Sequence, residues 1–135
     1  MNNIEARTNT KEAAWQVGKM REDTYDALEQ IPVVICKAQL LSSQYPFELL
    51  QSHVSRLYVT ILDMIQHILS WYKTNSGVKY FTAILRGDAY GEGLTKKLRK
   101  MKTLEERVED QAFVDQGDRI ISSSSHINVY ASFAN

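Results

Sequence analysis

The sequence predicts an all-α protein, an up-and-down bundle of four to five helices with one long central helix. Apolar residues recur at three- and four-residue spacing along most of the chain, which is the periodicity of amphipathic helices. Only two prolines and six glycines interrupt the chain, too few for the many turns of a sheet. Hydrophobic residues make up 44% of the 135 residues and charged residues 24%, as in a single globular domain.

Residues 47–73 are predicted to form the long central helix. Four further apolar residues, Val59, Leu62, Met64 and Trp71, lie outside its main stripe. A helix that is apolar around much of its circumference is expected at the centre of a bundle, contacted on several sides. The main stripe consists of Leu50, Val54, Leu57, Tyr58, Ile61, Ile65, Ile68, Leu69 and Tyr72.

The other predicted helices lie on either side of this segment. The first begins at Lys11 after the capping residue Thr10, and Pro32 is expected to break or kink it. A short helix is predicted to run from Val78 to near Gly87, and a last helix with near-heptad spacing covers residues 94–112. The predicted domain organisation is a disordered lead at 1–9, a helical bundle domain at 10–116 and a flexible tail or linker at 117–135. A mixed α/β alternative has support only in the final INVYASF.

Composition excludes several classes of protein. Sixteen basic residues balance sixteen acidic ones, which argues against a dedicated nucleic-acid binder. The single cysteine cannot form an internal disulfide, and the polar N-terminal segment lacks the apolar core of a secretory signal. The sequence contains no run of about 18 apolar residues, which is the length that a membrane-spanning helix needs. The predicted location is the cytoplasm.

The strongest candidate site is a basic cluster in the last helix. Glutamates and aspartates follow it, so that positive charge comes early in the helix and negative charge late, against the preference of the helix dipole. The cluster is a candidate interaction surface for an acidic partner or for lipid headgroups. The alternative is a solvated face with ion pairs between successive helical turns. The cluster consists of Lys96, Lys97, Arg99, Lys100 and Lys102.

Other candidate sites are weaker. Asp63 and His67 share one helix face and are able to reach one metal ion, but zinc needs further ligands, so an interhelical hydrogen-bond pair is favoured. Cys36 follows three apolar residues, which favours a small buried hydrophobe over a nucleophile. The glycine-dense window 87–93 follows a helical pattern instead of a strand, unlike a phosphate-binding loop. We therefore predict no catalytic, metal-binding or cofactor-binding residue and no enzyme.

Aromatic residues gather around the predicted turn at 75–77. They are able to line a ligand groove or a protein interface, although a hydrophobic plug that closes one end of the bundle is favoured. These residues are Trp71, Tyr72, Tyr80 and Phe81.

Three short patterns carry a family resemblance. Residues 57–62, LYVTIL, resemble the LY-x-x-IL helix of the helical N-terminal domain of fungal NLR-like (STAND/NACHT NTPase) signalling proteins. Lys97-Leu98-x-x-Met101 and the run 105–109, EERVE, resemble the last helix of that domain. The resemblance covers about residues 12–116 and implies a regulatory or effector bundle of innate immunity or programmed cell death, whose nucleotide-binding domain is outside this chain. Some related bundles oligomerise and engage membranes, but the polar N-terminal segment departs from the membrane-active type.

The sequence thus predicts a non-enzymatic signalling bundle that acts through a protein partner or through self-association. The alternative is a membrane-surface or cell-death effector that uses the basic helix. A metal- or ligand-binding bundle built around Asp63 and His67 is a third hypothesis.

Overall fold

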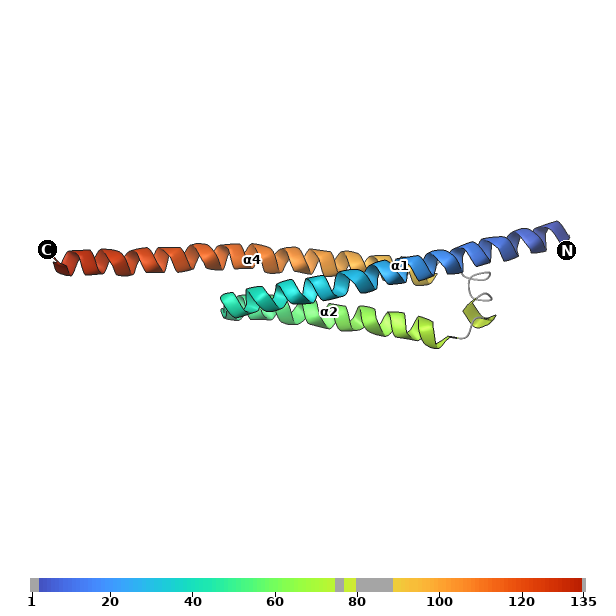
Figure 1. Cartoon of the computed structure of the whole chain (residues 1–135), viewed down its shortest axis with the longest axis horizontal. Helices are drawn as coiled ribbons and strands as arrows, with labels where there is room; N and C mark the ends of the chain where they lie inside the picture. Colours follow the sequence, from blue (N-terminus) through green and yellow to red (C-terminus); the bar gives the residue numbers. More distant parts are fainter. Residues whose placement is uncertain (1–2, 75–76, 80–88, 135) are drawn as a thin grey trace.

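The chain forms a bundle of long helices. The computed structural model describes residues 3–74, 77–79 and 89–134, with side chains placed for residues 11–74, 77–79 and 89–121. Three long helices account for nearly all of these residues: α1 spans Asn3–Gln44, α2 Glu48–Lys73 and α4 Ala89–Ala134 (Figure 1). Residues 77–79 are also helical, and the described ranges contain no strand. The predicted all-α, up-and-down bundle with a long helix is confirmed.

The helices lie side by side with alternating direction. α2 runs back along α1 after a turn at residues 45–47, and α4 runs in the same direction as α1 (Figure 1). The N-terminal part of α1 extends past one end of this three-helix region, and the C-terminal part of α4 extends past the other. The two ends of the chain therefore lie at opposite ends of the molecule.

Each helix contributes one apolar seam to a shared core. Buried residues in α1 and α2 are spaced alternately four and three residues apart, as in a coiled coil. In α4 the same spacing joins Leu94, Met101, Val108 and Ala112 through the half-buried Leu98 and Glu105. Burying one such leucine or methionine stabilises the fold by about 1.5–3 kcal/mol. The seam residues are Ala13, Val17, Met20, Thr24, Ala27, Ile31, Val34 and Ala38 in α1, and Leu50, Val54, Leu57, Ile61, Met64, Ile68 and Trp71 in α2.

The turn between α1 and α2 is fixed by side-chain hydrogen bonds. Ser42 Oγ donates to Gln51 Oε1 over 2.8 Å, and Gln51 Nε2 donates back to the Ser42 carbonyl over 3.1 Å. Arg119 Nη1 of α4 donates to the Gln44 carbonyl over 3.2 Å. These bonds set the register of α1 against α2 and hold α4 against the turn.

The helices are longer than the sequence predicted. α1 begins at Asn3 instead of Lys11 and continues through Pro32, so the predicted break at this proline is wrong. Ile31 and Val34 are buried on either side of Pro32, and their packing holds the helix together across the lost backbone hydrogen bond. α4 continues to Ala134 and thus includes most of the segment predicted as a flexible tail. The short helix predicted from Val78 to Gly87 lies mostly outside the described residues.

Among the described residues, α2 contacts long helices on two sides and not all around, in contrast to the prediction. It packs against α1 and α4, but Val59, Leu62 and Leu69 are 66%, 60% and 48% exposed. Met64 and Trp71, which the sequence placed outside the main stripe, are instead buried in the core. The excess of apolar residues in α2 thus forms an exposed surface.

Candidate interaction surface between α2 and α4

A hollow of about 650 Å³ lies between α4 and the middle of α2. The α4 side is cationic, because lysines and an arginine one helical turn apart point to the same side of the helix. The α2 side contributes the carboxylate of Asp63. The lining residues are Asp63, Gly93, Lys96, Lys97, Arg99, Lys100 and Thr103.

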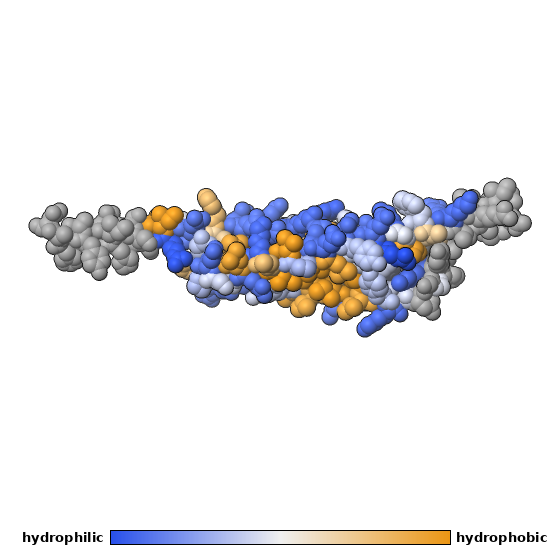
Figure 2. Space-filling view, viewed as in Figure 1, coloured by the Kyte–Doolittle hydropathy of each residue, from blue (hydrophilic) through white to orange (hydrophobic). Residues whose placement is uncertain are grey.

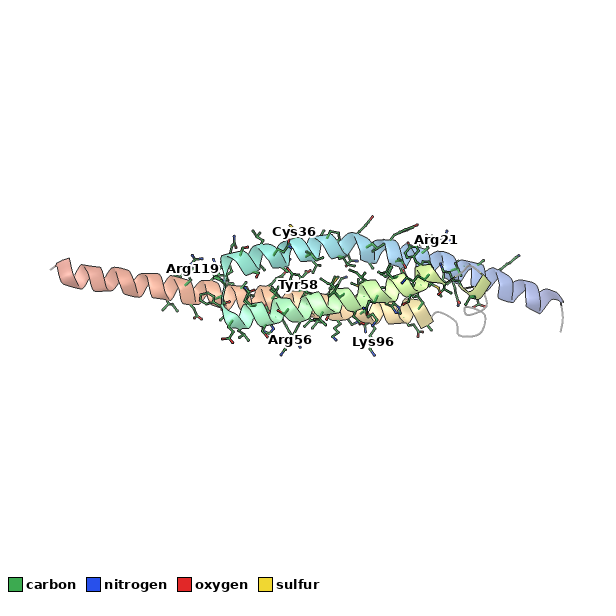
Figure 3. The ribbon with its side chains drawn as sticks, turned by 90° about the horizontal axis from the view of Figure 1, so that it is seen from below. Arg21, Cys36, Arg56, Tyr58, Lys96 and Arg119 are labelled. Carbon is green, nitrogen blue, oxygen red and sulfur yellow. The ribbon has the colours of Figure 1, made fainter. Side chains whose placement is uncertain are left out.

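A second hollow, of about 400 Å³, continues along the same two helices. Lys100 lines both hollows, so together they form one continuous surface, which we call the basic groove. Figure 3 shows Arg56 and Lys96 on the side of α2 that faces away from α1. The second hollow is lined by Ser55, Arg56, Val59, Thr60, Lys100, Leu104 and Arg107.

The basic groove has a strong positive charge although the whole chain is neutral. Six of its lining residues are cationic and one is acidic, which leaves a net charge of five. The single acid forms an ion pair in which Lys97 Nζ lies 2.5 Å from Asp63 Oδ2. The hydrogen bond from Lys97 holds the pKa of Asp63 below its usual value. The other cations face open solvent.

The structure brings four of the five predicted cationic residues into the basic groove. Lys102 is exposed but does not line the groove, because two residues rotate a side chain by about 200° around a helix. Sequence reasoning missed Arg56 and Arg107. Arg107 lies seven residues after Lys100, so heptad spacing was the signal that it gave. Arg56 lies seven residues before Asp63, but this spacing alone does not show that their side of α2 meets α4.

The acidic half of α4 is engaged within the molecule. Lys37 of α1 forms ion pairs with Glu105, over 3.7 Å, and with Glu109. The hydrogen bond with Glu109 raises the pKa of Lys37. The charge split along α4 therefore has a partial structural cause: Glu105 and Glu109 among its late acids join α4 to α1, while its early cations line the basic groove.

A family model covers most of the chain. The model described as "Domain of unknown function (DUF7708)" matches residues 13–120, which include the three-helix core and the whole basic groove. The chain belongs to the DUF7708 family. Comparison with curated proteins and with solved structures finds no match. Within the described residues of the DUF7708 domain, no helix is long and apolar enough to cross a membrane.

A column of stacked rings joins α2 to α4 beside Gly93 of the basic groove. Tyr90 stacks between His67 and Trp71, with ring centroids 4.8 and 5.0 Å away, and Lys79 Nζ lies 4.0 Å from the Trp71 centroid. His67 Nε2 is 3.1 Å from the Tyr90 carbonyl oxygen. Of the residues expected to form a hydrophobic plug, Trp71 is buried and Tyr72 packs edge-on against it but is 46% exposed, while Tyr80 and Phe81 lie outside the described residues. We call the side chains of His67, Trp71, Lys79 and Tyr90 the ring column.

The weaker candidate sites of the DUF7708 domain do not assemble into reactive centres. Asp63 pairs with Lys97 and His67 with Tyr90, which confirms the prediction of interhelical hydrogen bonds. Within residues 11–74, 77–79 and 89–121, no group of three histidine, cysteine or acidic residues is placed to hold a metal ion. Cys36 is exposed, so its predicted burial is wrong, because it lies on the outer side of α1 between the core residues Val34 and Ala38.

Proposed function

We propose that the DUF7708 domain is a non-enzymatic interaction module whose basic groove binds an acidic segment of a protein partner. The observation that carries this proposal is the concentration of cations along one groove, while two acids of the same helix, Glu105 and Glu109, pair with Lys37 of α1. Such a charge distribution attracts anionic partners and speeds their association.

The lining of the groove favours a peptide over a small anion. Val59 and Leu104 give the second hollow an apolar part, and Arg56 and Arg107 border it. A guanidinium binds a carboxylate through two parallel hydrogen bonds. An acidic segment with apolar side chains at helical spacing satisfies both parts of this surface.

The family context supports a signalling role. DUF7708 domains are common in fungal NLR-like proteins, the class that the sequence resembles. We therefore propose that the module is a cytoplasmic regulatory domain of innate immunity or programmed cell death. In this proposal it relays a contact to a nucleotide-binding domain outside this chain.

Binding of a designed peptide tests the proposal. The probe is a glutamate-rich amphipathic helical peptide, and its glutamine counterpart is the control ligand. We expect the acidic peptide to bind with an affinity that falls steeply with salt, because exposed charges are screened beyond about 10 Å at 0.1 M ionic strength. Fluorescence anisotropy over a salt series measures this.

Two variants of α4 locate the binding surface. Lys100→Glu lies where the two hollows meet and should weaken peptide binding about tenfold or more, since it replaces an attraction by a repulsion. Lys102→Glu makes the same change of charge on the same helix outside the groove, and should change the affinity less than about twofold. Equal losses in both variants would show that net charge, and not the groove, attracts the peptide.

A membrane surface is the alternative partner. Anionic lipids also attract clustered lysines, with about 1 kcal/mol per residue near the surface. The apolar part of the second hollow, Val59 and Leu104, favours a peptide with apolar side chains over a row of lipid headgroups. Co-sedimentation with phosphatidylserine vesicles separates the two: strong sedimentation at 0.15 M salt without peptide binding would favour the membrane.

A further inference from the structure

α2 has a second apolar seam beside the one in the core. Its residues are spaced four, three, four and three apart, the same pattern as the core seam. Ile65 and Tyr58 are half-buried, whereas Leu62, Leu69 and Tyr72 are 60%, 48% and 46% exposed. A stripe with this spacing fits the side of another helix.

α1 has a matching stripe on the same side of the bundle. Ser42 of α1 hydrogen-bonds to Gln51 of α2. One heptad further from the turn on each helix, Ile35 lies on the same side of α1 as Ser42, and Tyr58 on the same side of α2 as Gln51. The two stripes therefore border the same groove. Figure 2 shows apolar side chains gathered over the α1 and α2 of Figure 1. We call this surface the apolar face; it consists of Tyr25, Leu28, Pro32 and Ile35 of α1 and Tyr58, Leu62, Ile65, Leu69 and Tyr72 of α2.

The three grooves of the bundle differ in chemistry. Ion pairs of Lys37 bridge α1 and α4, and cations line the groove between α2 and α4. Only the apolar face combines an extended apolar surface with few charges, within residues 11–74, 77–79 and 89–121. Contiguous exposed apolar surfaces rimmed by polar residues are typical of interaction sites.

We propose that the apolar face is a homodimer interface, in which the α1–α2 pairs of two copies pack face to face and are related by a two-fold axis. An isologous interface requires a surface that is complementary to itself. A stripe of tyrosine, leucine and isoleucine meets this condition, since it pairs with a copy of itself without burying charge. The basic groove borders the other side of α2 and lies outside the four packed helices, so its cations do not face those of the second copy.

The charges at the two ends of the apolar face set the orientation of the dimer. Arg21 lies seven residues before Leu28, and Glu48 lies fourteen before Leu62, so both occupy positions of the face. Ser42 of α1 contacts Gln51 of α2, near Glu48, at one end of the face. Arg21 lies 21 residues before Ser42, and because the helices are antiparallel, it is level with residue 72 of α2 at the other end of the face. A two-fold axis that lies in the plane of the interface and crosses the helices at the middle of the face brings Arg21 of each copy opposite Glu48 of the other.

Sedimentation equilibrium of the full chain tests the interface. We expect a dimer at tens of micromolar and at least a tenfold weaker dimer for Leu62→Glu, because this exposed residue lies at the centre of the face. The control is Phe113→Glu, an equally apolar-to-acidic change at a 77% exposed residue of α4. It should leave the dimer within about twofold of wild type, and circular dichroism should show unchanged helix content in both variants.

A wild-type chain that stays monomeric at about 200 μM would overturn the proposal and would assign the face to a different partner. Equal weakening by Phe113→Glu would overturn it as well, because the interface would then involve α4.

A charge exchange tests the antiparallel arrangement. Arg21→Glu and Glu48→Arg should each weaken their own homodimer about three- to tenfold, because each variant places like charges opposite each other twice. A mixture of the two variants should form heterodimers with near wild-type affinity, since both contacts then regain opposite charges. Failure of the mixture to recover would exclude this orientation. Binding of the acidic peptide to the basic groove should be unchanged in Leu62→Glu, so the two proposals fail separately.

Discussion

Gly93 shows how closely α2 and α4 approach each other beside the ring column. A Cβ atom at this position would lie 3.0 Å from Cε1 and 3.1 Å from Nε2 of His67. An alanine would push the imidazole away from Tyr90, with which it stacks. Space, and not backbone conformation, therefore favours glycine at this helical position.

Replacement of two glycines by alanine measures this restriction. Gly117→Ala has nothing within 4 Å of the new Cβ and should raise the free energy of unfolding by about 1 kcal/mol, because alanine has the higher helix propensity. Gly93→Ala should gain less than this or lose stability. Urea denaturation gives both values, and a His67→Ala background should restore the full gain to Gly93→Ala. An equal gain for both glycines in the wild-type background would contradict the close contact.

Tyr90 links the ring column to α1. The Thr24 hydroxyl donates to the Met20 carbonyl over 2.7 Å, so the Tyr90 hydroxyl donates to Thr24 Oγ1 over 2.6 Å. Burial raises the pKa of Tyr90 above its usual value of about 10. The fold therefore favours the protonated phenol.

This shift predicts a loss of stability at alkaline pH. A raised pKa gives a stabilising contribution that is fully present below pH 10 and is lost as the pH rises through the pKa of the folded state. Tyr90→Phe should lower the stability at pH 7 by about 1 kcal/mol, through the lost hydrogen bond, and should reduce the decline above pH 10. Thermal unfolding at pH 7 to 11 measures both effects. A decline that is equally steep in the variant would assign the alkaline effect to other groups, of which Lys37 is the first candidate, since its pKa is also raised.

At the scale of elements, α1 contains an unusual proline. Pro32 lies inside the helix on its exposed side and removes one backbone hydrogen bond. The ring of Pro32 belongs to the apolar face. Proline at this position therefore lowers the stability of the helix and enlarges the exposed apolar surface.

Pro32→Ala should therefore stabilise the monomer. We expect the free energy of unfolding to rise by about 1–3 kcal/mol, because alanine restores the hydrogen bond and the propensity of the helix. Gln39→Ala, one heptad later at an equally exposed position, should change stability by less than about 0.5 kcal/mol. Chemical denaturation of both variants at a concentration below dimerisation provides the comparison. A loss of stability in Pro32→Ala would show that the ring makes packing contacts that outweigh the missing bond.

The predictability of each element followed from its periodicity. The bounds of α2 agree with the prediction within one residue, because a turn with proline precedes it and polar residues follow it. The extensions of α1 and α4 beyond the core were missed, since residues 3–9 and 117–134 lack a continuous apolar stripe. The basic groove was found only on α4. Arg56 could not be assigned to it, because the sequence does not show which side of α2 meets α4.

At the scale of the whole molecule, the grooves between the helices differ in chemistry. A bundle of three helices has three grooves, and each has a different character here: one is joined by ion pairs, one is basic and one is apolar. The basic groove and the apolar face border α2 on different sides. A dimer formed through one therefore leaves the other open to a partner in both copies, and binding becomes bivalent toward a partner with two acidic segments.

The alternating directions of α1, α2 and α4 also have a mechanical consequence. The chain enters the bundle at one end and leaves it at the other (Figure 1), so proteins fused to its two ends are held apart by at least the length of α2, whose 26 residues span about 39 Å. A pull on both ends draws α1 and α4 in opposite directions along their axes. Such a load acts in shear on every turn of the core at once, so we expect the domain to resist extension as one rigid unit.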